Sequence, residues 1–108
     1  QTAIETACAP YGISVENVED MKPIYMDKNG KVIQEMLAVY RQITGDTTEP
    51  MVIGGGTYAK SLKNIIAFGP EMPGIDYRIH SADEYILVSG MEESVLIYME
   101  AIKNLLAI

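Results

Sequence analysis

The 108-residue sequence has a single cysteine, a single histidine and no tryptophan. Because a disulfide needs two cysteines, Cys8 cannot form one within the chain, nor can it supply a zinc site built on cysteine pairs. It lies on an apolar helix face, where a thiol behaves as a small, inert hydrophobe. The sequence also lacks an apolar run near the roughly 20 residues that a membrane helix needs, and its first residues do not resemble a secretory leader. We therefore expect a cytoplasmic protein.

Positive charge is also scarce. Lys and Arg together number 8, against 15 for Asp and Glu, so the net charge is −7. Nucleic acids and anionic membranes bind cationic surfaces, and we expect neither as a partner. With 48% hydrophobic and 21% charged residues, the composition is typical of a globular chain with one modest core. Because the chain begins with Gln1 inside a helical pattern, we expect it to be part of a longer polypeptide.

Apolar residues at helical spacing predict three main helices. The first ends at Gly12. The second runs from Val32 to Ile43 and ends at Gly45, because glycine adopts the left-handed cap without a side-chain penalty; Asp27 or Asn29 is expected to cap its start. The third lies near the end of the chain.

Short apolar runs predict strands at residues 13–15, 51–53 and 65–68. A short helix over 58–63, capped by Thr57, is expected between the last two. Two Ser-x-x-Glu capping boxes predict helix starts at Ser81 and Ser89, and the acidic stretch 16–25 is the expected domain crossing. This alternation of helices and strands predicts an α/β fold.

The segment Gly54-Gly55-Gly56-Thr57 is a candidate binding loop. Glycines after a strand let a backbone approach a ligand closely, and free N–H groups at a helix start attract anions; alternatively, the glycines only serve a turn that needs positive φ. The segment also matches a loose dinucleotide pattern, with Ala59 in the third place and Glu71 as the ribose-binding acid. Against a nucleotide site, only about eight residues separate the two strands, whereas a parallel crossover needs roughly a dozen or more.

His80 is the second candidate. It follows a loop rich in glycine and proline, where an imidazole is well presented for a metal or for acid–base chemistry. A catalytic zinc needs about three protein ligands, so one histidine is insufficient. Asp76, Asp83 and Glu84 are nearby carboxylates, although the last two are expected at a helix start, where the helix dipole favours them. The alternative is a histidine held by a local hydrogen bond.

Three separated strings of the sequence carry a resemblance to a known family. They are Lys22-Pro23-Ile24-Tyr25, then Val39-Tyr40 … Thr44-Gly45 … Glu49-Pro50 … Ile53-Gly54-Gly55-Gly56-Thr57-Tyr58-Ala59-Lys60, then Ala67-Phe68-Gly69-Pro70 … Pro73-Gly74 … His80-Ser81-Ala82-Asp83-Glu84-Tyr85-Ile86. Together they resemble the C-terminal segment of the dinuclear-zinc dipeptidases, most closely the bacterial dipeptidase V type. This family also contains aminoacylases, carnosinases and succinyl-diaminopimelate desuccinylase. The resemblance covers nearly the whole chain and is weakest over residues 1–20.

The resemblance implies the C-terminal part of a two-domain zinc exopeptidase. Residues 1–24 would then be the end of a lid domain, and residues 25–108 would supply the last strands and helices of the catalytic domain. His80 corresponds to the last ligand of one of two metal ions, which are zinc, with manganese or cobalt as alternatives. Gly55, Gly56 and Thr57 would lie against the dipeptide substrate. Lys60 stands where many relatives carry Arg, and it lacks the planar fork that binds a carboxylate bidentately.

In this family the other metal ligands and the glutamate general base lie upstream of the matching segment. The whole enzyme would cleave unblocked dipeptides with metal-activated water, and the isolated chain is predicted to be inactive and to bind zinc weakly at best. Two other functions stay open, a nucleotide-binding module and a non-catalytic module for packing or dimerisation. A homodimer is possible through apolar helix faces that carry Met36, Tyr40, Met99 and Ile102.

Overall fold

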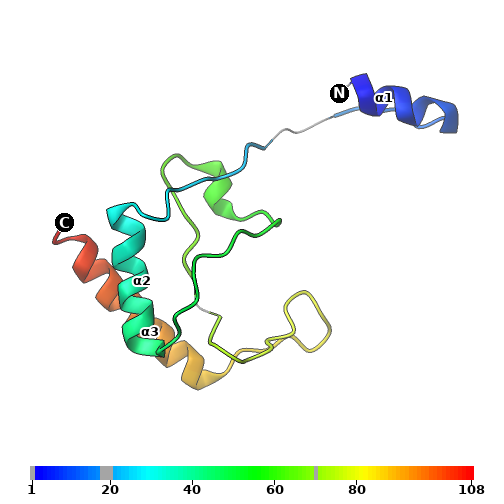
Figure 1. Ribbon diagram of the computed structural model, residues 1–108. Coiled ribbons are helices and arrows are strands. Elements are labelled where there is room, and N and C mark those ends of the chain that lie inside the picture. Colours follow the sequence, from blue (N-terminus) through cyan, green and yellow to red (C-terminus); the bar gives the residue numbers. More distant parts are fainter. Residues whose placement is uncertain (1, 18–20, 70) are drawn as a thin grey trace.

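The computed structural model describes residues 2–17, 21–69 and 71–108. In chain order it contains α1 (Thr2–Cys8), the 3₁₀ turn η1 (Ala9–Tyr11), α2 (Lys31–Thr44), the 3₁₀ turn η2 (Tyr58–Ser61) and α3 (Val88–Leu105) (Figure 1). These ranges contain no β-strand. The predicted α/β fold is therefore wrong for this structure, which consists of helices joined by extended and turning chain.

The predicted strands fail because an apolar run indicates a tendency to be buried, whereas a strand also needs a hydrogen-bonded neighbour. Residues 51–53 are extended chain without a ladder, and Val52 is fully exposed, at 101%. Residues 13–15 and 65–68 likewise have no strand partner among the described residues. Pairing depends on distant segments, which local apolarity does not reveal.

The prediction for α2 is confirmed. It ends at Gly45, whose φ of 72° is left-handed and whose N–H donates to the Arg41 carbonyl. The expected caps at its start are wrong, because the N-cap is Gly30 and makes no side-chain bond. Asp27 instead accepts a hydrogen bond from the Asn29 backbone N–H at 2.9 Å.

Both predicted capping boxes are also wrong. Residues 81–83 form turns and start no helix. Helix α3 begins at Val88, and its N-cap, Leu87, makes no side-chain bond. By contrast, the Thr57 cap is confirmed, although η2 is a 3₁₀ turn and ends at Ser61.

Helices α2 and α3 pack together and carry the core. Ile97 on α3 is completely buried, at 0% exposure, and Val39 and Ala101 lie against it. Met72 and Tyr77, from the loop before α3, complete this cluster. The loop that leads to His80 is therefore attached to the helix pair by two buried side chains.

The chain is elongated. Its radius of gyration is 18.9 Å, whereas a compact chain of this length has about 13 Å. Figure 1 shows α1 at the far end of the molecule from α2 and α3, and α1 has no buried residue. The predicted crossing at residues 16–25 joins these parts, and its residues 18–20 lie outside the described ranges. No described helix is both long and apolar enough to cross a membrane.

Candidate functional site

The segment Gly54–Thr57 leads into η2. Thr57 is extended, with φ −131° and ψ 167°, and its Oγ1 accepts a hydrogen bond from the Ala59 N–H at 3.2 Å. The Lys60 N–H donates to the Thr57 carbonyl at 3.0 Å. Threonine therefore starts the turn with both its side chain and its backbone.

The three glycines do not serve a left-handed turn. The glycines with positive φ are Gly12, Gly45 and Gly74, and none of them belongs to this segment. A Cβ added at Gly54 or Gly55 would meet no atom within 4 Å. A requirement for positive φ therefore does not explain why these three residues are glycine. What the glycines do provide is an exposed backbone, and at Gly56 the nearest side chain is that of Lys60.

Lys60 lies beside the third glycine. Its Nζ is 3.8 Å from the position that a Cβ on Gly56 would take, and the side chain is half-buried. None of the ion pairs found among the described residues includes Lys60. The ammonium group thus lies over the Gly56 backbone, and no carboxylate among residues 2–17, 21–69 and 71–108 forms an ion pair with it.

A cavity of about 480 Å³ lies at this point, lined by Met21, Gly56, Thr57, Tyr58, Lys60 and Ser61. It is a depression largely open to solvent and not an enclosed pocket. Three of the four predicted substrate-binding residues line it, namely Gly56, Thr57 and Lys60; Gly55 does not. Sequence reasoning gave no binding role to Met21. No local pattern marks it, since it comes from the crossing segment far away in the sequence.

His80 lies elsewhere, at the tip of a loop whose ends are tied together. The Tyr85 N–H donates to the Tyr77 carbonyl at 3.3 Å, and the two tyrosine rings are 6.1 Å apart. His80 is exposed, has a left-handed φ of 60°, and donates its backbone N–H to Glu84 Oε2 at 3.2 Å. The His80 side chain is therefore exposed on a loop closed by backbone hydrogen bonds, and it is not buried in the core.

Two of the carboxylates near His80, those of Asp76 and Asp83, interact with Arg78. Asp83 forms an ion pair with Arg78 at 3.7 Å, and Asp76 accepts the Arg78 N–H at 2.9 Å. Across the described part of the chain, no three His, Cys, Asp or Glu side chains are grouped so that they could hold a metal. The donor set present thus amounts to one free imidazole, which does not fit a complete metal site.

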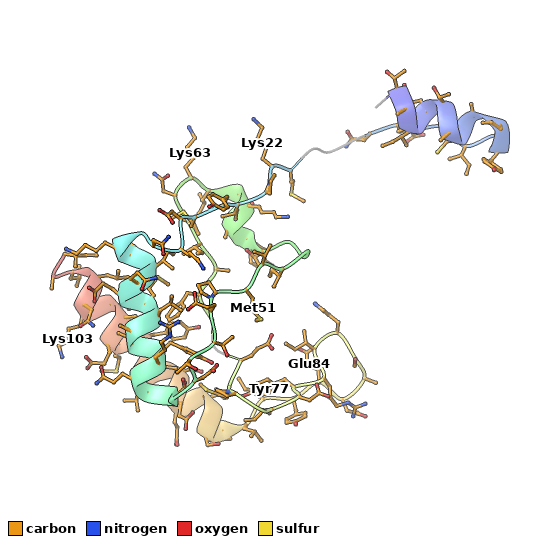
Figure 2. The ribbon with its side chains drawn as sticks, viewed as in Figure 1. Lys22, Met51, Lys63, Tyr77, Glu84 and Lys103 are labelled. Carbon is orange, nitrogen blue, oxygen red and sulfur yellow. The ribbon has the colours of Figure 1, made fainter. Side chains whose placement is uncertain are left out.

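A second cavity, of about 200 Å³, lies beside this loop and is lined by Glu71, Tyr77, Ile79, Glu84, Tyr85 and Ile86. Glu71 therefore belongs to a different cavity from the glycine segment. Figure 2 shows Glu84 well away from Lys22, which follows Met21 of the first cavity, and from Lys63, which is two residues after Ser61 of that cavity. The structure does not bring His80 and Lys60 into one cavity. The adjacent parallel strands that a nucleotide site requires are also absent from the described residues.

Comparison with known proteins gives one family. The model of peptidase family M20/M25/M40 matches residues 3–104. A protein of Staphylococcus aureus (strain USA300) named "Putative dipeptidase" is 39% identical over 95 residues, and one of the same name from Staphylococcus haemolyticus is 38% identical. Each match covers 88% of this chain and 20% of the relative, so the chain spans about a fifth of the length of these curated relatives. No solved structure matches the chain at a comparable level.

Proposed function

Because the chain belongs to peptidase family M20/M25/M40, we propose that it is part of a metal-dependent dipeptidase that cleaves unblocked dipeptides. The names of its relatives support a dipeptide as the substrate. The observation that carries the proposal is the cavity in which Gly56, Thr57 and Lys60 come together. We propose this cavity as one wall of the substrate site.

Lys60 would bind the substrate's carboxylate. A half-buried ammonium without an ion-pair partner among the described residues attracts an anion, and the bare Gly56 backbone lets that anion come close. Lysine acts as a point charge, whereas arginine offers a planar fork. We therefore expect one strong contact rather than a bidentate pair.

His80 would contribute one metal ligand. Its exposed imidazole is free to turn towards a metal, and neutral histidine is a common ligand of zinc. The remaining ligands and the general base would lie outside these 108 residues. When bound, the metal ions, which we propose to be zinc, would lower the pKa of a water molecule and so supply the nucleophile. The isolated chain would lack most of this apparatus and would be inactive.

The test uses the longer polypeptide that we propose contains this chain, assayed on Ala-Ala with and without a chelator. We expect cleavage that chelation abolishes and zinc restores. His80→Ala should abolish activity, while the neighbouring Ser81→Ala should preserve it. No cleavage with zinc, manganese or cobalt, or full activity in His80→Ala, would contradict the proposal.

Lys60 has a separate test. Lys60→Ala should raise KM at least tenfold, since a charge-assisted contact contributes about 1.5–3 kcal/mol. Lys63→Ala removes an exposed lysine that does not line the cavity and serves as the matched control. An equal rise of KM in both variants would show a general charge effect and would contradict the role of Lys60.

A further inference from the structure

The cavity around Lys60 has two chemically different sides. Lys60, Thr57 and Ser61 provide the polar groups, all within or beside η2. Met21 and Tyr58 provide a thioether chain and an aromatic ring. A ligand that fits both sides therefore carries a negative group and an apolar group.

The apolar groups have free surface. Met21 is 63% exposed and Tyr58 is 95% exposed, so neither side chain is buried in the hydrophobic core of the described residues. The buried core cluster lies on α2, α3 and the loop before α3, and it includes neither residue. A ligand that covers these two side chains removes their apolar surface from water, which favours binding by about 25 cal/mol per Å² of buried surface.

The two residues come from separate parts of the chain. Met21 belongs to the segment that leads towards α2, whereas Tyr58 opens η2. Met21 is a long, unbranched side chain that adapts to differently shaped neighbours. A wall of this kind accepts several large apolar groups and gains little from a small one.

We propose that Met21 and Tyr58 determine substrate specificity, and that they favour dipeptides whose C-terminal residue has a large apolar side chain. The inference rests on the proposed function, in which Lys60 binds the carboxylate of that same residue. Because the carboxylate and the side chain branch from one Cα atom, a carboxylate at Lys60 places the side chain within the same cavity. Met21 and Tyr58 are the apolar surfaces there.

The experiment compares kcat/KM for Ala-Leu, Ala-Phe, Ala-Gly and Ala-Asp, using the longer polypeptide. The unmodified enzyme should prefer Ala-Leu and Ala-Phe to Ala-Gly. Met21→Gln keeps the length of the side chain but makes its end polar, and should lower the Leu-to-Gly ratio roughly tenfold, within the range of discrimination of apolar pockets. Met21→Leu should keep the ratio, and Tyr58→Ala should lower the Phe-to-Gly ratio.

The matched control is Met91→Ala, which changes a half-exposed methionine on α3 that lines neither cavity. It should leave all four values unchanged. A parallel fall for every dipeptide in Met21→Gln, or an unchanged ratio, would overturn the inference while leaving the proposed function standing. Absence of cleavage of any dipeptide by the unmodified enzyme would instead overturn the proposed function, and this inference with it.

Discussion

The hydroxyl of Tyr40, one residue before the last turn of α2, donates a hydrogen bond to Oδ2 of Asp46, which lies just after the helix has ended; the distance is 2.8 Å. The other oxygen of Asp46 accepts from the Thr48 N–H at 3.0 Å and from the Thr48 hydroxyl at 2.6 Å. Arg41 reaches Glu49 at 2.8 Å. These bonds hold the chain against α2 immediately before it enters the segment that leads to Gly54.

The first prediction concerns acid stability. Hydrogen bonds from Thr48, and then from Tyr40, lower the pKa of Asp46 below its ordinary value of 3.8. A lowered folded-state pKa contributes stability above the unfolded-state pKa, and that stability is lost as the pH falls through the folded-state pKa. Asp46→Asn should therefore have a lower thermal midpoint than the unmodified protein at pH 7. The difference between the two midpoints should become smaller as the pH falls towards 2. Parallel curves from pH 7 to pH 2 would contradict this.

The second prediction concerns alkaline stability. Burial, and then the Asp46 carboxylate, raise the pKa of Tyr40 above 10.0. A raised folded-state pKa contributes stability below the unfolded-state pKa, and that stability is lost as the pH rises through the folded-state pKa. Tyr40→Phe should be less stable at pH 8, with a smaller deficit above pH 10. Tyr11→Phe, at an exposed tyrosine of η1, should show neither effect.

The third prediction concerns the core. Ile97 is fully buried, whereas its neighbour Leu96 on α3 is 54% exposed. Ile97→Ala should cost about 2–5 kcal/mol, because it removes apolar contacts and leaves a cavity. Leu96→Ala should cost about 0.5 kcal/mol or less. Urea unfolding measures both, and similar losses in the two variants would contradict the assignment of the core.

The fourth prediction separates two kinds of glycine. Gly45 ends α2 in the left-handed region, where a Cβ costs roughly 1–2 kcal/mol. Gly54 has neither a positive φ nor an atom near its missing Cβ. Gly45→Ala should thus destabilise the fold by about that amount, and Gly54→Ala should leave the free energy of unfolding nearly unchanged. Equal effects would contradict this distinction.

The fifth prediction concerns association of the 108-residue chain. Of the four apolar residues suggested for a dimer face, Met36 is buried and Tyr40 half-buried, while Met99 and Ile102 on α3 are exposed. We propose that this face of α3 mediates self-association. Ile102→Glu should shift the sedimentation of the chain towards the monomer, and Tyr25→Glu, at an exposed position outside α3, should not. A chain that is monomeric at all concentrations would refute the proposal.

What could be predicted from the sequence was local. Helix α2 follows from apolar spacing between Val32 and Ile43, and its end follows from Gly45, because both signals act within a few residues. The Thr57 cap is similarly local. Strands over 51–53 and 65–68 could not be judged in this way, because pairing depends on a distant partner.

The same limit applies to the candidate site. The motif around Gly56, Thr57 and Lys60 was visible as a contiguous string. Met21 was not, because its place in the cavity depends on how the crossing segment passes η2. The capping boxes at Ser81 and Ser89 failed for local reasons. The Glu84 carboxylate accepts a hydrogen bond from the His80 backbone N–H within a closed loop and does not start a helix. Ser89 lies inside α3, which begins one residue earlier at Val88.

In the open backbone from Gly54 to Gly56, the requirements of folding and of catalytic activity can be measured separately. Its torsion angles and surroundings do not require glycine at Gly54 or Gly55, so a library of variants screened for folding should tolerate many side chains there. The same library, extended to Gly56 and screened for hydrolysis, should reject most side chains at Gly56, because this glycine lines the cavity that we assign to the substrate, whereas Gly54 and Gly55 do not. The difference between the two rankings would outline the substrate on this stretch of backbone, residue by residue.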